Sequence, residues 1–246
     1  MESSIHYSMT SLEILIALTT ITVGAFIQGS VGFGLAMISV PVLLLINPEF
    51  IPGPLLCATL TLTSLTIYRD RIGIDNADLP WALAGRIIGT PLGLFALASV
   101  SRDNLDLMFG SLILFSVLLS ASGLRLLPTP KSLIGAGTLS GFMGTTSSIG
   151  GPPMALLYQG TEGIRLRGTL AVFFTIGVVI SLVGLTAVGR FGLRELSLGL
   201  LLQPGILAGF FLSSRMAANL DHGYTRQAVL SVAGALGTVV IIRQLL

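Results

Sequence analysis

Two clusters of glycine, hydroxyl and amide residues are the parts of this sequence most suited to chemistry. The first lies at residues 24–34 and holds four glycines, Gln28 and Ser30, and the second lies at residues 144–153. Closely spaced glycines favour a break in a helix, and a helix that restarts after a break offers free N–H groups and the positive end of its dipole. We expect the two clusters to bind one small oxyanion. Tight helix packing without a ligand is the alternative.

A single arginine, Arg86, lies about seven residues inside an apolar segment. An arginine at membrane depth costs a few kcal/mol and usually belongs to a site or a polar path, although it can also snorkel to the interface. We expect Arg86 to supply positive potential to the anion site. The expected substrate-binding residues are Gln28, Gly29, Ser30, Gly32, Phe33, Gly34, Arg86, Gly144, Thr145, Thr146, Ser147, Ser148, Gly150, Gly151, Pro152 and Tyr158.

Residue types needed for catalysis or metal binding are sparse. Cys57 is the only cysteine, and His6 and His222 lie in a tail and a connector. Ser147 and Ser148 have no nearby histidine or aspartate for a hydrolase triad, and no P-loop motif is present. No acidic residue lies well inside an apolar segment, which argues against a carboxylate proton relay. We therefore expect no catalytic residue, no metal and no cofactor, and the chain is not expected to be an enzyme.

Composition places the elements that carry these residues in a lipid bilayer. Of the 246 residues, 52% are hydrophobic and 10% are charged, whereas a soluble domain carries about 25% charge. The mean hydropathy is +0.92. The net charge of +2 indicates no nucleic-acid partner. Residues 1–11 lack lysine and arginine, so no cleaved signal peptide is expected. The class predicted is an all-α, multi-pass membrane protein.

Eight apolar segments are predicted, four on each side of a proline-rich stretch at residues 127–131. They lie at residues 12–46, 51–68, 79–100, 105–124, 133–158, 166–188, 193–213 and 228–246. Each half opens with a glycine-interrupted segment, and each third segment carries glycines four residues apart, at 89 and 93 and at 205 and 209. We interpret residues 1–127 and 128–246 as two transmembrane repeats. General abundance of glycine is the alternative explanation.

Basic residues in the connectors favour an inverted arrangement of the two halves. If all eight segments cross once, alternate connectors hold seven basic residues (69, 71, 125, 131, 190, 194 and 243) against five (102, 165, 167, 215 and 226). If the two interrupted segments are hairpins that enter and return, the numbers are eight (69, 71, 125, 131, 165, 167, 215 and 226) against four (102, 190, 194 and 243). The positive-inside rule favours the larger asymmetry by a small margin.

Three motifs together resemble the sulfite exporter TauE/SafE family. They are Gly29-Ser-Val-Gly-Phe-Gly34 followed by Pro41, Gly141-Phe-Met-Gly144 continued to Gly150-Gly-Pro-Pro153, and Arg167-Gly-Thr-Leu-Ala-Val-Phe-Phe174. The resemblance covers nearly the whole chain. It implies a transporter that moves sulfite, sulfoacetate or a related organosulfonate across the cytoplasmic membrane, with both glycine clusters forming the substrate region.

The expected mechanism is secondary transport by alternating access, in the direction of export. An anion channel, or a transporter of another small anion such as a carboxylate, is the alternative. The expected partners are the anion and the bilayer. The sequence leaves open whether two copies form a homodimer.

Overall fold

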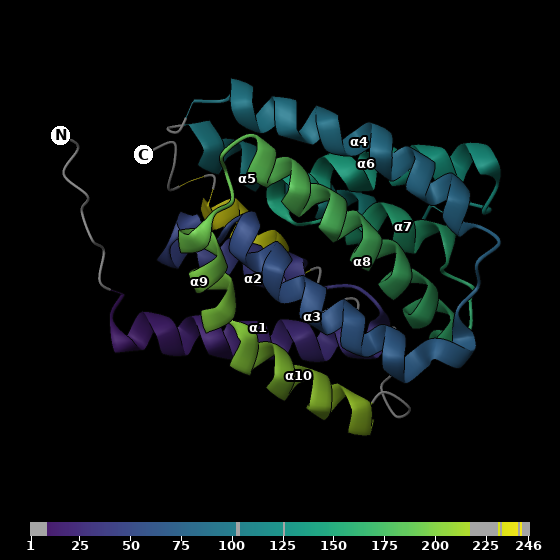
Figure 1. The fold of residues 1–246 in the computed structure, drawn as a ribbon, viewed down its shortest axis with the longest axis horizontal. Coiled ribbons are helices and arrows are strands. Elements are labelled where there is room, and N and C mark those ends of the chain that lie inside the picture. Colours follow the sequence, from purple (N-terminus) through teal and green to yellow (C-terminus); the bar gives the residue numbers. More distant parts are fainter. Residues whose placement is uncertain are drawn as a thin grey trace.

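The computed structural model describes residues 9–101, 104–124, 126–216, 231, 233–240 and 242, and the regular structure in these residues is helical (Figure 1). The elements are α1 (Ser11–Val31), α2 (Leu35–Ile46), η1 (Pro48–Phe50), α3 (Gly53–Asp70), η2 (Arg71–Gly73), α4 (Leu79–Ser99), α5 (Leu105–Ala121), α6 (Pro130–Ser147), α7 (Gly151–Leu157), α8 (Gly163–Ala187), α9 (Leu193–Leu201) and α10 (Gln203–Met216). The predicted all-α class is confirmed.

Three helices are long and apolar enough to cross a bilayer, namely α1, α4 and α8. The pair α9 and α10 makes a fourth when it is taken as one span with a bend of 41°. Length and composition therefore support three or four spans in the described residues, fewer than the eight segments predicted. The last predicted segment, 228–246, lies largely outside the described residues.

Both glycine-interrupted segments are broken. Helix α1 stops at a left-handed Gly32 with φ of 101°, and α2 starts after Gly34, whose φ is 127°. Such positive φ values are accessible to glycine and strained for other residues. Helix α2 then returns alongside α1, because a Cβ on Gly24 would lie 2.8 Å from Ser39 Oγ. The segment 12–46 is thus a helical hairpin.

The second broken segment turns back in the same way. Helix α6 ends at Ser147, and Ser148 adopts the left-handed conformation with φ of 65°. The chain then reverses, since Ser140 Oγ donates a hydrogen bond of 2.6 Å to Gly150 O, ten residues further along. Helix α7 is short, with seven residues.

Helices α3 and α8 run antiparallel at the centre of the bundle. The start of α8 lies at the end of α3, where a Cβ on Gly168 would be 2.8 Å from Asp70 O. Further along, the hydroxyl of Thr175 donates to that of Thr63 at 2.8 Å. Higher numbers in one helix therefore face lower numbers in the other.

Two parallel helix pairs flank this central pair. In α4 and α6, a Cβ on Gly85 would lie 2.8 Å from Thr138 N and a Cβ on Gly93 would lie 2.8 Å from Phe142 O. The glycines let the two backbones touch, as the four-residue spacing predicted.

The second pair consists of α1 and α10. A Cβ on Gly205 would lie 2.9 Å from Leu18 O, and a Cβ on Gly209 would lie 2.7 Å from the Cβ of Ala25. The third predicted segments of both halves therefore make the same kind of close glycine contact with the broken segment of the other half.

These directions bring most of the described basic residues to one end of the bundle. Helices α1, α3 and α10 end there and α4, α6 and α8 begin there, on the right in Figure 1. We call this end the basic face, and its described basic residues are Arg69, Arg71, Lys131, Arg165, Arg167 and Arg215. The opposite end has Arg190 and Arg194 among the described residues.

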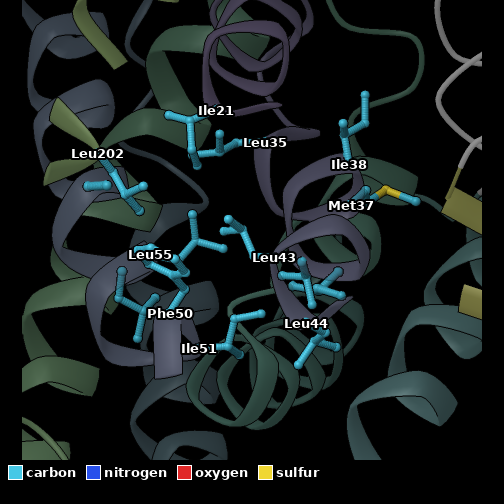
Figure 2. Close-up of a cluster of buried hydrophobic side chains, with 14 of the residues drawn as sticks. Ile21, Leu35, Met37, Ile38, Leu43, Leu44, Phe50, Ile51, Leu55 and Leu202 are labelled. Carbon is cyan, nitrogen blue, oxygen red and sulfur yellow. The ribbon is translucent and has the colours of Figure 1, made fainter. Parts of the chain in front are cut away.

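An apolar cluster packs the first hairpin against α3 and the α9–α10 junction. Figure 2 shows Leu35 of α2 beside Ile21 of α1, and Leu43 beside Leu55 of α3. All four side chains are at most 1% exposed. Burying apolar side chains against one another holds the hairpin even though its backbone is broken.

Replacing Gly89 with alanine tests the close α4–α6 contact. A Cβ there would meet the backbone carbonyl of Thr138 at less than the 3.0 Å that real Cβ atoms keep. We expect Gly89→Ala to lower the free energy of unfolding by about 1–3 kcal/mol through overpacking, measured as a reduced melting temperature in detergent. Gly135→Ala, on α6 with nothing within 4 Å of its Cβ, is the matched control and should melt at or slightly above the native temperature, because alanine is the better helix former. Equal melting temperatures for the two variants would contradict the packing.

Candidate functional site

A small cavity lies where the two breaks meet. Its volume is about 30 Å³, and the residues that line it come from both broken segments and from α3, α4 and α8. Of the predicted site residues, those that line it are Gln28, Gly34, Arg86, Gly144, Ser148, Gly150, Gly151 and Pro152. The remaining lining residues are Ala36, Met37, Leu56, Thr59, Ile149, Phe174 and Val178. The structure thus brings residues from both sequence clusters to one place.

Direct contact between the breaks accounts for this convergence. A Cβ on Gly151 would lie 3.0 Å from the Cβ of Phe33, so the second break presses against the first where Gly151 has no side chain. Ser148 ties the second break to the start of α3 by donating 3.1 Å to Pro52 O.

The first break presents the start of α2 to the cavity. Its N-cap residue is Gly34, which has no side chain to cap the helix. Gln28 fills part of that role, as its Oε1 accepts from Leu35 N at 3.2 Å. The Nε2 group of Gln28 therefore keeps its donor N–H groups for another partner. Helix α2 has 12 residues, so its dipole and its first-turn N–H groups contribute positive potential at this edge of the cavity.

The second break contributes less backbone potential than the sequence predicts. Helix α7 has only seven residues, and its second and third positions are Pro152 and Pro153, which have no N–H group. A short helix with two prolines in its first turn offers few free donors. The positive potential on this side of the cavity comes from Arg86 instead.

Arg86 is buried, with 1% of its surface exposed. Its Nη1 donates to Ser140 O at 2.9 Å and to Ser140 Oγ at 3.2 Å, and its Nη2 donates to Ser181 Oγ at 3.1 Å. Its Nε has no hydrogen-bond partner. Arg86 therefore does not snorkel to the interface, because the guanidinium is held inside the bundle by α6 and α8.

Three glycines make room for the guanidinium. A Cβ on Gly144, Gly150 or Gly177 would lie 2.8, 3.0 or 2.6 Å from an atom of this group. The ring of Phe173, with its centroid 5.8 Å from the Arg86 Cζ, adds a cation–π contact. Within the described part of the chain, Arg86 forms no ion pair. This cationic side chain is therefore hydrogen-bonded, but no residue described around it neutralises its charge.

Several predicted hydroxyls do not face the cavity. Ser30 donates to Phe26 O at 2.7 Å, Thr146 donates to Phe142 O at 2.8 Å, and Ser147 donates to Met143 O at 2.9 Å. Each of these hydroxyls is used by a carbonyl of its own helix one turn back, and none of the three residues lines the cavity, so their binding of substrate stays a prediction. Hydroxyls in helices commonly make this bond when no better partner is near.

Other predicted residues either position a partner of Arg86 or lie outside the cavity lining. Thr145 Oγ1 lies 2.8 Å from Ser181 Oγ and so supports a partner of Arg86. The Tyr158 hydroxyl donates to Asp78 at 3.3 Å, and Tyr158 does not line the cavity. Gly32 forms the C-cap of α1, and Phe33 lines a larger pocket next to the cavity.

An ion cluster at the end of α1 is a feature that sequence reasoning missed. Asp70 accepts from Arg69 Nη2 and from Arg167 Nε, both at 2.8 Å, and its side chain is 5% exposed. Arg69 Nη2 also donates to Gly29 O at 2.6 Å, and Arg167 Nη1 donates to Ser30 O at 3.4 Å. The cluster therefore donates hydrogen bonds to carbonyls that the end of α1 leaves free. Gly29, a predicted site residue, contacts the cluster through its carbonyl.

Neutral lining residues were also missed. Met37, Leu56, Phe174 and Val178 close the cavity, and Thr59 adds a hydroxyl on α3. Nothing in the sequence distinguishes these side chains from other apolar residues, whereas the charges of Arg69 and Arg167, at the ends of the predicted segments 51–68 and 166–188, were a usable signal.

The comparisons with known proteins give one match. A family model described as sulfite exporter TauE/SafE matches residues 16–240, which is nearly the whole chain. Neither a curated protein nor a solved structure gives a match.

Removing the carboxylate of Asp70 tests the ion cluster. We expect Asp70→Asn to lower the free energy of unfolding by about 3 kcal/mol, because two little-exposed arginines lose their counter-charge. Thermal unfolding in detergent measures this loss.

Asp75→Asn is the matched control. Asp75 pairs with Arg165, whose side chain is 57% exposed, and the backbone N–H of Ala77 together with Arg165 lowers the pKa of Asp75. Exposed pairs contribute about 0–1 kcal/mol, so this variant should melt close to the native temperature. If Asp70→Asn also melts there, the cluster does not hold the hairpin.

Proposed function

The chain belongs to the sulfite exporter TauE/SafE family, and we propose that it is a secondary transporter that exports a small sulfur-containing anion across the cell membrane. Family membership implies a multi-pass membrane transporter of sulfur anions, and a role other than that of an enzyme. Sulfite, sulfoacetate and related organosulfonates are the substrates that we propose.

The observation that carries this proposal is the unbalanced charge of Arg86 at the meeting point of the two breaks. A buried charge is costly unless an opposite charge or hydrogen bonds compensate it. Of the residues that line the cavity, Arg86 is the only charged one. A bound anion would supply the missing countercharge. The same potential would repel a cation.

Hydrogen-bond donors around the cavity suit the oxygens of a sulfite or sulfonate group. Arg86 Nε has no partner, Gln28 Nε2 keeps its donors, and the N-cap residue of α2, Gly34, has no side chain to cap the first-turn N–H groups that follow Leu35. Donors from separate elements around one point match the several oxygens of an oxyanion, and hydrogen bonds with a charged partner are the stronger ones. The proposed substrate contacts are thus Arg86, Gln28 and the backbone at Gly34, with Ser148 beside them.

The size of the cavity requires movement during transport. Its 30 Å³ is close to the roughly 30 Å³ that one water occupies in the liquid, and a sulfite or organosulfonate is larger. Binding must therefore push the two breaks apart. Since the two breaks belong to different hairpins, separation of the hairpins would both admit the anion and open a path, as alternating access requires.

Helix directions support an inverted repeat as the basis of this movement. We propose that α1, α3 and the α9–α10 pair correspond to α6, α8 and α4. On this assignment, the antiparallel α3 and α8 exchange places, and the α4–α6 contact becomes the α10–α1 contact. A two-fold axis in the membrane plane produces this relationship.

Membrane potential would drive the proposed export. A negative interior favours outward movement of an anion by about 2.3 kcal/mol per charge per 100 mV. Export in this direction needs no carboxylate relay, which agrees with the absence of acidic residues from the cavity lining.

Counterflow of labelled sulfite in proteoliposomes tests the proposal. We expect saturable, protein-dependent exchange that unlabelled sulfite or sulfoacetate inhibits. Single-channel currents would indicate the alternative, an anion channel, and exchange of carboxylates without sulfur anions would indicate a different substrate class. Absence of flux for all of these sulfur anions would contradict the proposal.

Arg86→Gln tests the role of the buried charge. A hydrogen bond to a charged group contributes about 1.5–3 kcal/mol, so its loss should weaken apparent sulfite affinity about 10- to 100-fold. Arg71→Gln makes the same change of charge on the exposed surface and should transport normally. Both variants are compared at equal amounts of folded protein, judged by size-exclusion chromatography. If Arg86→Gln keeps the native affinity for sulfite, Arg86 does not belong to the binding site.

A further inference from the structure

A second, larger pocket lies next to the central cavity. It has a volume of about 750 Å³ and is lined by Phe33 of the first break, by α7, by residues 159–163 and by the end of the α5–α6 connector. Its outer rim includes Leu127, which is 79% exposed, and Gln159, which is also exposed. Its inner wall includes the buried Pro152. The pocket therefore runs from the surface to the level of the breaks.

Only a thin wall separates this pocket from the cavity at Arg86. Pro152 lines both spaces. Phe33 lines the pocket and the next residue, Gly34, lines the cavity. The Phe33 side chain lies against Gly151, whose added Cβ would be 3.5 Å from a ring carbon. Phe33 thus covers the direct way from the pocket to the cavity.

The backbone on both sides of Phe33 is suited to a hinge. Gly32 and Gly34 have φ values of 101° and 127°, which side-chain-bearing residues rarely adopt. Hinges absorb large backbone changes in a few residues at the ends of elements, and glycine lowers the cost of such changes. Rotation at these two glycines would move the Phe33 ring without moving the helices on either side.

The pocket opens at the basic face. Gln159 Nε2 donates to Leu124 O at 3.1 Å, which places the pocket rim at the end of α5 and near the start of α8. Six of the described basic residues lie at this face and two at the opposite end. By the positive-inside rule, the basic face is the cytoplasmic one.

We propose that this pocket is the cytoplasmic entrance for the exported anion and that Phe33 is the gate between the entrance and the cavity at Arg86. The proposal rests on the proposed export function. In the structure the entrance is open to the surface, and the Phe33 side chain lies against Gly151 between the entrance and the cavity. An anion would enter from the cytoplasm and displace Phe33. It would then pair with Arg86.

Cysteine accessibility tests the gate without depending on transport. Cys57 is the only native cysteine, so Cys57→Ala gives a background without thiols. In this background, Thr161→Cys reports on the entrance, because Thr161 lines the pocket. Met37→Cys reports on the cavity, because Met37 lines the cavity and is 2% exposed. A charged, membrane-impermeant methanethiosulfonate is added to inside-out vesicles or to intact cells.

We expect Thr161→Cys to react in inside-out vesicles and not in intact cells. Met37→Cys should react slowly in vesicles, and adding Phe33→Ala should raise its rate at least about tenfold, equal to about 1.4 kcal/mol in the opening equilibrium. Phe95→Ala removes an equally large ring from a surface position that is 73% exposed, and it should leave the rate unchanged.

The outcomes separate the gate from the transport function. Reaction of Thr161→Cys only from outside would overturn the cytoplasmic entrance. An unchanged Met37→Cys rate with Phe33→Ala would overturn the gate, even if sulfite exchange is normal. Expected labelling together with no sulfite exchange would support the gate and contradict the proposed function.

Discussion

Broken backbone inside a bilayer is the constraint on which this structure depends. Polar groups freed by a break have no water to bind, so the protein must satisfy them. Arginine does this directly at the first break, where Arg69 and Arg167 donate to Gly29 O and Ser30 O at the end of α1. At the second break Ser140 Oγ donates to Gly150 O, and Arg86 donates in turn to Ser140 O and Oγ. Cationic side chains from other helices therefore contact both hairpins.

The two arrangements differ in their charge balance, and the proposed site rests on this difference. At the end of α1, Asp70 pairs with both arginines and leaves one excess positive charge at the bundle surface. Arg86 has no ion pair among the described residues and lies 1% exposed, next to the cavity. The first cluster has its anion built into the chain. In the second, an anion from solution would complete the same type of interaction, and its departure would restore the cost of the buried charge. That cost would oppose release of the anion unless the cavity also opens, so binding and release would be linked to movement.

Sequence alone predicted the all-helical class and the positions of both breaks, because closely spaced glycines are a local signal. For Arg86 it left both a buried site and snorkelling open, and the structure shows the side chain buried. It did not predict where hydroxyls point. Ser30, Thr146 and Ser147 share a composition typical of an anion site, yet each donates to a carbonyl of its own helix. Rotamer choice depends on neighbours from other helices, which a single segment does not specify. The Asp70 cluster was missed for the same reason, since its members come from α3 and α8 and act on α1.

Glycine richness has a specific physical cause in this protein beyond close helix packing. Around Arg86, three glycines lie where any Cβ would be 3.0 Å or less from the guanidinium. Two of them, Gly144 and Gly150, also border the second break and line the cavity. A residue with a side chain at any of these positions would displace the cation or fill the space beside it. The glycines that weaken the helix are thus the ones that admit the charge. A fold with a continuous α6–α7 helix would lose both the cavity and the room for Arg86, so the break and the buried cation depend on each other.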